Sequence, residues 1–309
     1  MRPAAKRVLV APSSFCDVDR LPISRLEGEG WEVIRNPYGR KLTKAELVAL
    51  LPDVTGIIAG LEPLTRDVLE KSQLRVISRC GAGLSNVDLD AAQSMGIKVR
   101  STPDAPTVAV AELTVGVLIA LLRKVAPMDR DMHVGRWNKQ IGVQLAGKTV
   151  VIVGIGRIGR KVAGLLRPFD VKLCAVDPAL AGTVEGIPIL PLDQAIRQAD
   201  VICLHAGGEE EILGAKEFAR MKRGVFLLNA GRGGLVDESA LCAAMQSGTV
   251  AGAWIDTFSR EPYQGPLASL DQALLTPHIG SLTVECRRRM ELESVDNLLD
   301  AFAELASRS

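Results

Sequence analysis

The stretch that most restricts the fold of this chain is residues 147–178, GKTVVIVGIGRIGRKVAGLLRPFDVKLCAVDP. An apolar run at residues 150–153 leads directly into the glycine-rich GIGRIG, and a helical pattern follows it. A second apolar run, at residues 171–176, ends on Asp177. This order predicts a strand, a tight turn, a helix and a second strand, which is the βαβ unit of a dinucleotide-binding fold.

Each glycine of the predicted turn has a separate physical task. Gly154 permits the sharp turn, Gly156 lets the backbone approach a pyrophosphate, and Gly159 lets the helix pack against the strand. Free N–H groups and the positive end of the helix then meet the phosphates. Asp177 can accept hydrogen bonds from the adenosine ribose, and its charge would repel a 2′-phosphate. The sequence therefore predicts NAD rather than NADP; the alternative is a turn whose glycines serve packing alone.

The composition is that of a globular protein large enough for two domains. The chain has 309 residues, of which 47% are hydrophobic and 24% charged, so it can bury a large core. A formal net charge of +1 provides no basic surface for nucleic acid, which favours a small-molecule partner. The six cysteines have no CxxC spacing, as expected of free thiols in a reducing cytoplasm.

Two apolar segments are too short or too polar for a membrane-spanning or targeting element. Residues 8–11 form an apolar run that is too short for the core of a signal peptide, and we expect a first strand there. Residues 108–122 contain Glu112 and fall short of the ~20 residues that cross a bilayer. We therefore expect a buried helix and no membrane partner.

From residue 6 to residue 100, short apolar runs alternate with helical patterns, which predicts a parallel sheet. Thr43 and Glu46 have the spacing of a helix-capping box, and Thr65 stands where it could cap the next helix. The expected strands are residues 7–11, 31–35, 56–59, 75–78 and 97–100, and the expected helices are residues 43–51, 65–71 and 88–95.

Pro103 and Pro106 interrupt the chain after the fifth expected strand, so we place the first domain crossing there. A helix at 107–124 and a charged connector lead to the second alternating series. We expect an α/β fold with two Rossmann-like, doubly wound parallel-sheet domains and a cleft between them. The later elements are strands at 201–204, 225–229, 251–255 and 274–276, helices at 192–198 and 238–247, and a last helix at 284–306 that returns to the first domain.

His278 and Glu261 each follow an expected strand, where ligands meet an open parallel sheet. A histidine there can donate or accept a proton near neutral pH, or it can be an ordinary loop histidine. If Glu261 reaches His278, its carboxylate favours the protonated imidazole and fixes its orientation. Otherwise Glu261 is a solvated loop charge.

Arg232 lies in NAGRGGLVDE, again directly after an expected strand. Its planar guanidinium can bind a substrate carboxylate and polarise the neighbouring carbonyl, although a surface turn with a solvated arginine fits the same pattern. In the first domain, Arg79, Gly81, Ala82 and Gly83 lie where a strand leads into a helix. The backbone N–H groups of that turn could bind a carboxylate, or the glycines could serve the turn alone.

The chain has two further histidines. His205 ends an expected strand, which suits contact with the cofactor more than proton transfer, and His133 is expected at the surface of the connector. His, Cys and carboxylate residues show no metal-ligand spacing, and no serine nucleophile motif is present, so we expect no metal.

Together these stretches resemble the D-isomer-specific 2-hydroxyacid dehydrogenase family, most closely its phosphoglycerate-dehydrogenase-like branch. The resemblance covers nearly the whole chain, and the combination of GIGRIG, NAGRGGLVDE, DTFSREP and TPHIG carries it. It implies an enzyme that interconverts a D-2-hydroxy acid and its 2-keto acid with NAD. It also implies that Arg232, Glu261 and His278 form the catalytic triad.

The resemblance further implies a substrate domain of residues 1–102 and 283–309, a nucleotide domain of residues 103–282, and an active site in the cleft. Arg79, Gly81, Ala82, Gly83 and Arg232 would bind the substrate. Members are usually homodimers joined through the nucleotide domain. The implied cofactor-binding residues are Gly154, Gly156, Arg157, Ile158, Gly159, Asp177, His205, Ala230, Gly231, Arg232, Asp256, His278 and Gly280.

Two departures from the family pattern leave options open. After His205 the chain carries Glu209, Glu210 and Glu211, which either weaken cofactor binding or point to solvent. Residues 59–63 contain no Arg or Lys for a substrate phosphate, so D-3-phosphoglycerate is only one candidate substrate. The alternatives to this activity are a non-enzymatic, NAD-responsive corepressor-like protein and a dehydrogenase of another hydride donor, such as phosphite or formate.

Overall fold

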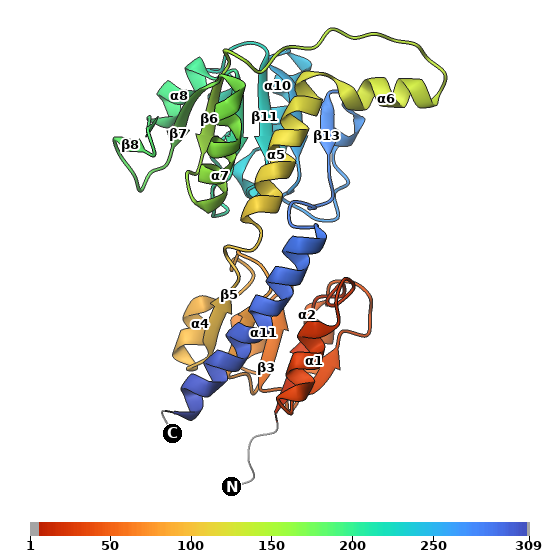
Figure 1. The fold of residues 1–309 in the computed structure, drawn as a ribbon, viewed down its shortest axis with the longest axis vertical. Coiled ribbons are helices and arrows are strands. Elements are labelled where there is room, and N and C mark those ends of the chain that lie inside the picture. The colour runs from red at the N-terminus through yellow and green to blue at the C-terminus, as the bar shows by residue number, and fades with distance from the viewer. Residues whose placement is uncertain (1–5, 308–309) are drawn as a thin grey trace. The chain divides into compact units, whose positions relative to one another are not determined.

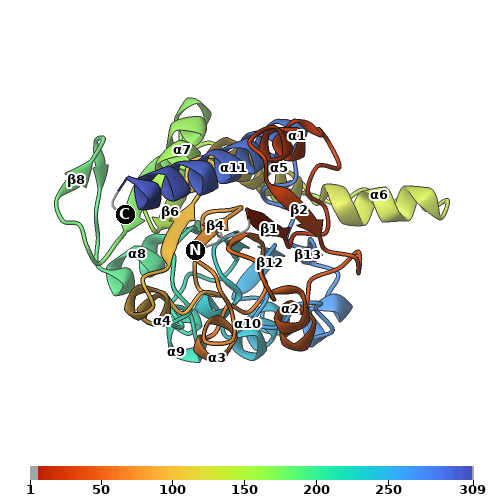
Figure 2. The same cartoon turned by 90° about the horizontal axis from the view of Figure 1, so that it is seen from below.

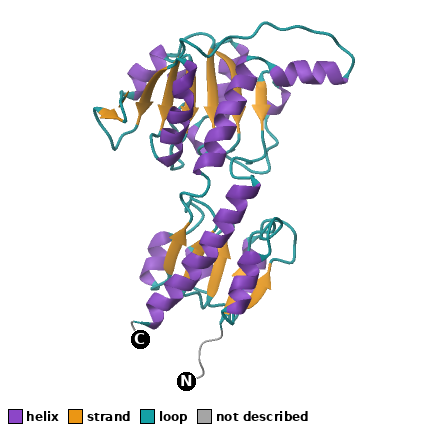
Figure 3. Cartoon of the chain, viewed as in Figure 1, coloured by secondary structure: helices purple, strands orange, loops and turns teal. Residues whose placement is uncertain are grey.

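The computed structural model describes residues 6–307 and divides the chain into two compact units. Unit 1 combines the chain up to Pro106 with the chain from Leu282 onward, and unit 2 is Thr107–Ser281. Each unit is a parallel β-sheet with helices packed on both of its faces (Figure 1 and Figure 3). This is the α/β, Rossmann-like architecture that the alternating sequence pattern predicts. The chain crosses between the units at 106/107 and 281/282, where the sequence suggested 102/103 and 282/283.

The sheet of unit 1 is parallel throughout, with the strand order β2-β1-β3-β4-β5. All five strands were expected from the sequence, and their observed ends differ from the expected ones by at most one residue. Their bounds are β1 (Arg7–Val10), β2 (Glu32–Arg35), β3 (Gly56–Ala59), β4 (Val76–Arg79) and β5 (Lys98–Ser101).

Both faces of this sheet are buried, because side chains alternate along each strand. In β1, Leu9 packs with the helices of one face, whereas Val8 and Val10 pack with those of the other. The first face carries α2 (Lys44–Leu50), α3 (Arg66–Leu69) and α4 (Leu89–Ser94), and the second carries α1 (Leu21–Gly28) and α11 (Val284–Ala306).

The C-terminal helix α11 therefore returns to the first unit, as expected, and it packs on β3, β4, β5 and α1. The capping box at Thr43 is also confirmed, since its side chain accepts the Glu46 N–H. Thr65 does occupy the N-cap position of α3, but the expected capping bond is wrong: its hydroxyl donates to Asp67 Oδ1 at 2.8 Å. The short helix α1, with Pro22 in its first turn, was not expected from the sequence.

The sheet of unit 2 has the order β13-β12-β11-β10-β6-β7 and is also parallel throughout. The order reverses between β6 and β10, and such a reversal marks the crevice where open α/β sheets bind ligands. The strand bounds are β6 (Thr149–Val153), β7 (Lys172–Val176), β10 (Val201–Leu204), β11 (Val225–Asn229), β12 (Val250–Ile255) and β13 (Ala273–Leu275).

Helices cover both faces of this sheet as well. The helices α5 (Thr107–Leu122) and α7 (Arg157–Leu166) pack on one face. On the other face lie α8 (Leu192–Gln198), α9 (Ala215–Phe218) and α10 (Glu238–Gln246). Within residues 6–307, every helix is too short or too polar to span a bilayer, and α5 is a core helix.

Unit 2 also contains elements that the sequence analysis did not anticipate. The charged connector forms a helix, α6 (Val125–His133), which buries none of its residues and extends away from the sheet in both views (Figure 1 and Figure 2). His133 ends this helix and is exposed, with Nε2 3.5 Å from Asp129. A small hairpin of β8 (Thr183–Val184) and β9 (Ile187–Pro188) follows β7.

Candidate active site

The glycine-rich turn joins β6 to α7 at the point where the strand order of unit 2 reverses. Gly154 has a φ of +90°, and a Cβ there would lie 2.5 Å from the backbone N of Ala206, just beyond β10. A Cβ on Gly159 would lie 2.2 Å from the Gly154 carbonyl oxygen. A Cβ on Gly156, by contrast, would meet no atom within 4 Å. The turn is thus closely packed on its inner side and open in front of the first N–H groups of α7.

Asp177 closes one side of this turn from the end of β7. Its Oδ2 accepts the Ile155 N–H at 3.2 Å, and its Oδ1 accepts the Ala179 N–H at 3.1 Å. The carboxylate is therefore fixed beside the glycine-rich turn, where the sequence places an acceptor for ribose hydroxyls.

His205 lies at the other side of the turn, directly after β10. Both of its ring nitrogens are buried and have no hydrogen-bond partner among the described residues. Burial lowers the pKa of His205 to about 4, so the imidazole is neutral at physiological pH. A buried, unsatisfied donor and acceptor is costly unless a ligand or a water molecule provides partners.

These three features fit a dinucleotide. The open space at Gly156 faces the N-terminus of α7, a ten-residue helix, and such a terminus attracts phosphate. Arg157 and Ile158 begin that helix, with Arg157 exposed to solvent. Glu209, Glu210 and Glu211 are also exposed. The carboxylate of Asp177 and the unsatisfied imidazole of His205 flank the space.

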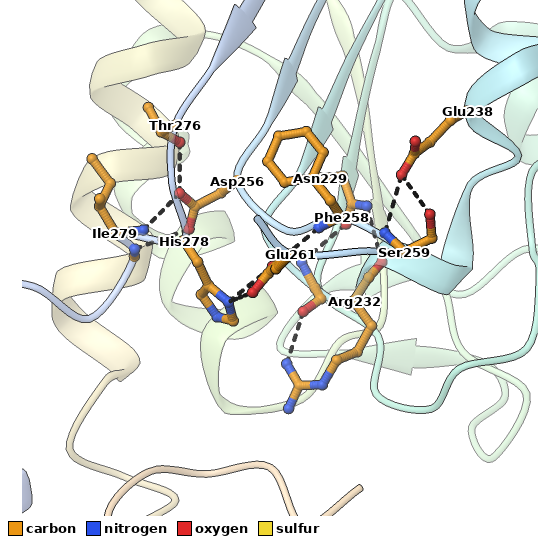
Figure 4. A network of polar contacts seen from close by, with 12 residues as sticks. Asn229, Arg232, Glu238, Asp256, Phe258, Ser259, Glu261, Thr276, His278 and Ile279 are labelled. Atoms are coloured by element: carbon orange, nitrogen blue, oxygen red, sulfur yellow. Dashed lines mark hydrogen bonds and ion pairs between the residues drawn. The ribbon is translucent and has the colours of Figure 1, made fainter. Parts of the chain in front are cut away.

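A second group of polar side chains follows β11, β12 and β13, which are neighbours in the sheet. His278 and Glu261 contact each other there: His278 Nδ1 lies 3.2 Å from both carboxylate oxygens of Glu261 (Figure 4). Their side chains are 38% and 34% exposed, so the pair is accessible to a ligand. The condition that the sequence left open, whether Glu261 reaches His278, is met.

The loop after β12 holds Glu261 in place. Glu261 Oε1 accepts the Phe258 N–H at 3.2 Å, and the Phe258 ring stacks on Tyr263 with centroids 4.2 Å apart. Glu238, at the start of α10, accepts hydrogen bonds from both the backbone N–H and the hydroxyl of Ser259. The carboxylate that faces His278 thus belongs to a loop anchored on both sides.

The turn that carries His278 is held by Asp256. His278 has a φ of +55°, a left-handed conformation that is uncommon for a residue with a Cβ. Asp256 is 2% exposed, and its two oxygens accept the N–H groups of Ile279 at 2.8 Å and Gly280 at 2.9 Å. The two residues after His278 are therefore tied to the end of β12.

A short chain of hydrogen bonds extends this anchor into the core. The Thr276 hydroxyl donates to Asp256 Oδ1 at 2.5 Å, and it accepts a hydrogen bond from Trp254 Nε1 at 2.8 Å. Trp254 is fully buried in β12. The sequence analysis assigned no role to Thr276 or Trp254; Thr276 lies inside the TPHIG motif, whereas Trp254 gave no signal.

Arg232 follows β11, the remaining strand of this group. Its Nη1 donates to the Gly231 carbonyl at 2.8 Å, and Asn229 holds the turn by accepting the Gly231 N–H and donating to the Arg232 carbonyl. The half-buried guanidinium forms no ion pair with a carboxylate in the described part of the chain. The three residues of the expected triad therefore follow neighbouring strands of one sheet, and the contact between His278 and Glu261 joins two of them. The turn begins at Ala230, which is half-buried.

In unit 1, Arg79 ends β4 and is 8% exposed, and the glycine-rich turn follows it. Arg79 donates to the Cys80 carbonyl. The Gly81 N–H donates to Thr102 Oγ1 at 2.8 Å, so this amide is already bonded within the unit. Ala82 is exposed and Gly83 is half-buried. Within residues 6–307, no group of three or more His, Cys, Asp or Glu side chains is arranged to hold a metal.

Comparisons with known proteins place this geometry in a family. Residues 115–280 match the family described as D-isomer specific 2-hydroxyacid dehydrogenase, NAD binding domain. The hydroxypyruvate reductase of Thermotoga maritima is 37% identical over 275 residues, which cover 85% of this chain and 89% of the relative. This chain belongs to the D-isomer specific 2-hydroxyacid dehydrogenase family. As a dehydrogenase of this family it is an oxidoreductase with an NAD(P)-binding domain in unit 2.

Two further proteins are similar over most of this chain. Human D-3-phosphoglycerate dehydrogenase is 36% identical over 286 residues, covering 89% of this chain but 53% of the relative, so the chain spans about half of that protein. The crystal structure of the TT0316 protein from Thermus thermophilus superimposes with a TM-score of 0.87 at 33% identity and covers 96% of this chain and 97% of that one.

Proposed function

We propose that this chain is an NAD-dependent dehydrogenase that interconverts a D-2-hydroxy acid and its 2-keto acid. The contact between His278 and Glu261 carries the proposal, because it creates an oriented proton donor at the edge of the nucleotide-binding sheet. When bound, the reduced cofactor supplies the hydride that the keto carbon accepts.

His278 acts as the general acid in the reducing direction. Because Nδ1 faces the Glu261 carboxylate, its N–H donates to Glu261 and Nε2 is left to face the substrate. Protonated Nε2 delivers its proton to the carbonyl oxygen as the carbon is reduced, and neutral Nε2 removes the hydroxyl proton in the reverse direction. Glu261 accepts the Nδ1–H and so keeps the ring in one orientation.

Arg232 binds the substrate carboxylate and polarises the adjacent keto group. Its guanidinium is half-buried, and its only hydrogen bond given by the described residues is to the neighbouring Gly231 carbonyl, so several of its five N–H groups remain for a ligand. A planar guanidinium forms two parallel hydrogen bonds to a carboxylate, which fixes both the position and the rotation of the substrate.

The cofactor of the proposed reaction is NAD rather than NADP. Asp177 is held at the end of β7 by two backbone N–H groups, and its negative charge would repel the 2′-phosphate of NADP. We propose that the pyrophosphate lies against Gly154, Gly156, Gly159 and α7, starting with Arg157 and Ile158. The nicotinamide half would contact His205, Ala230, Gly231, Arg232, Asp256, His278 and Gly280.

In unit 1 we propose that Arg79 and the turn of Gly81, Ala82 and Gly83 contribute to substrate binding. Of the three amides, that of Gly81 already donates to Thr102, so it holds the turn, and Ala82 and Gly83 are the better donors for a carboxylate. Within this class of acids, D-3-phosphoglycerate is one candidate substrate.

The test is a panel of 2-keto acids with NADH, followed by loss of absorbance at the nicotinamide band. Turnover with at least one acid is expected, and His278→Ala should reduce kcat by roughly 10²–10⁴-fold while NADH still binds. NADH binding with no turnover, together with a protein partner that binds only in the presence of NADH, would instead support the corepressor-like alternative. Turnover of phosphite or formate with NAD, and of no hydroxy acid, would identify another hydride donor.

We also propose that the protein is a homodimer in which α6 and the segment after it contact the second copy. This segment of unit 2 exposes a row of apolar side chains, including Trp137 at 76% and Ile141 at 92% exposure. Apolar surface that extends from the body of a domain is typical of an interface. A paired substitution, Trp137→Lys with Ile141→Lys, is expected to yield a monomer by light scattering, and Lys139→Ala is the control for the same segment.

A cytoplasmic location completes the proposal. All six cysteines are free thiols, although five of them are buried and well protected. Proteins that keep several free thiols are typical of reducing compartments. Targeting of a fluorescent fusion of the full chain tests this location.

A further inference from the structure

The loop that follows β3 in unit 1 folds around its own acidic side chain. Glu62 is 2% exposed although it belongs to a four-residue connection between Ala59 and Leu64. Its Oε2 accepts the Gly60 N–H at 2.6 Å, so the carboxylate turns back onto the loop that carries it. The Gly60 N–H is the first backbone donor beyond the carboxyl end of β3, and the Glu62 carboxylate already accepts its hydrogen bond.

The surrounding contacts fix this arrangement. Asn86 Nδ2 donates to the carbonyl oxygens of Gly60 at 3.2 Å and of Glu62 at 2.7 Å. A Cβ on Gly60 would lie 3.0 and 3.2 Å from the two Glu62 oxygens, so the carboxylate fills the space that a larger residue at position 60 would need. Leu61 is 42% exposed and is the side chain that this loop presents outward.

Burial has the largest effect on the charge of Glu62. It raises the pKa of the carboxyl, and its own backbone N–H, that of Gly60 and the positive charges of Arg79 and Lys41 offset this only in part. Arg79 is thus electrostatically coupled to a carboxylate inside the unit. A ligand anion at this edge would have to compete with Glu62 both for the Gly60 N–H and for the positive charge of Arg79.

We propose that Glu62 determines specificity by occupying the Gly60 N–H beyond the end of β3, so that the enzyme takes 2-keto acids whose substituent carries no phosphate or second carboxylate. This inference rests on the proposed function. Ligands of open parallel sheets bind beyond the carboxyl ends of the strands, and β3 and β4 end here in Ala59 and Arg79. In this loop the Gly60 amide is already bonded, the Glu62 carboxyl is buried and Leu61 faces outward. This arrangement suits a keto acid with a short uncharged substituent.

The test compares hydroxypyruvate with 3-phosphohydroxypyruvate, which differ only by the phosphate. In the unchanged protein kcat/KM should favour hydroxypyruvate by about 10–100-fold, the size expected for one or two charge-assisted hydrogen bonds that cannot form. Glu62→Gln keeps an acceptor for the Gly60 N–H but removes the charge that faces Arg79, so it should keep only part of the preference. Glu62→Ala leaves the Gly60 N–H without this acceptor and should reduce the preference for hydroxypyruvate by about tenfold or more. A preference for the phosphorylated acid in the unchanged protein would overturn the proposal.

A binding measurement separates this inference from the proposed activity. Inorganic phosphate should raise the Tm of Glu62→Ala more than that of the unchanged protein or of Glu62→Gln, because only the alanine variant frees the Gly60 N–H. Equal shifts in all three proteins would overturn the role of Glu62 even if the enzyme reduces keto acids. If no keto acid is reduced, the proposed function fails, and the Tm comparison still decides whether Glu62 excludes anions. If Glu62→Ala does not fold, the kcat/KM ratio of hydroxypyruvate to 3-phosphohydroxypyruvate in the unchanged protein decides, and a ratio below one overturns the proposal.

Discussion

His278 Nδ1 lies 3.2 Å from both carboxylate oxygens of Glu261, although 16 residues separate them along the chain and they follow different strands. This contact leaves Nε2 as the ring nitrogen that can exchange a proton with a ligand. It also makes Glu261 a positioning group whose removal should disturb proton transfer more than binding.

We expect Glu261→Gln to lower kcat by about tenfold to several hundredfold, because a Gln amide can present its N–H group to Nδ1 and so favour the wrong imidazole tautomer. Steady-state kinetics measure this loss. Glu70→Gln, at an exposed position in unit 1, is the matched control. An unaltered kcat in Glu261→Gln would remove Glu261 from the mechanism.

Thr276 connects the core to the turn of His278, so its hydroxyl should matter for both stability and catalysis. We expect Thr276→Val to cost about 1–3 kcal/mol of unfolding free energy, because Trp254 Nε1 and Asp256 Oδ1 each lose a buried partner. It should also lower kcat more than it changes the KM for NADH, since the turn is displaced. Urea unfolding and steady-state kinetics measure these effects.

Thr276→Ser keeps the hydroxyl and should restore most of both quantities. Trp254→Phe removes only the indole donor, and we expect its effect on stability to combine non-additively with that of Thr276→Val, because both changes act on the same hydrogen bond. Full additivity in the double variant would show that the chain of hydrogen bonds does not act as a unit.

His205 should make the protein less stable in mild acid. Its pKa is about 4 in the folded chain and 6.5 when exposed, so the unfolded chain binds the extra proton between these values. Stability should therefore fall as the pH drops from 6.5 to 4, by up to about 3 kcal/mol from this residue. Chemical unfolding at pH 7, 5.5 and 4.5 measures it. In His205→Gln this part of the pH dependence should disappear, and an identical slope in both proteins would contradict the assignment.

Asp177 should set the choice of cofactor. We expect Asp177→Ala to weaken NADH binding by about tenfold, since one or two charge-assisted hydrogen bonds to the ribose are lost. The preference over NADPH should shrink further, because the repulsion of a 2′-phosphate is removed. KM values for both cofactors measure the change, and Asp271→Asn, whose side chain is 98% exposed, is the control. A constant NADH to NADPH ratio would count against this role.

Most of the scaffold could be predicted from local sequence. The bounds of strands such as β3 and β10 were predicted correctly, because a short apolar run between turn residues has few other stable environments. The helix α6 was missed because the segment was interpreted from its charged residues as a connector, although it forms a helix that buries none of its side chains. The capping bond expected at Thr65 was wrong: its hydroxyl donates to Asp67, two residues on, and accepts no N–H from the first turn of α3.

The sequence by itself determined the two alternating α/β series, the glycine-rich turn with Asp177, and the residue types that follow each strand, because these depend on short-range periodicity and on local backbone demands. Only the tertiary structure decided that Glu261 meets His278, that Thr276 and Trp254 support Asp256, and that Glu62 is buried against Gly60. Such contacts join residues on separate strands or turns, and their distances follow from how the sheet and its loops pack rather than from any pattern along the chain.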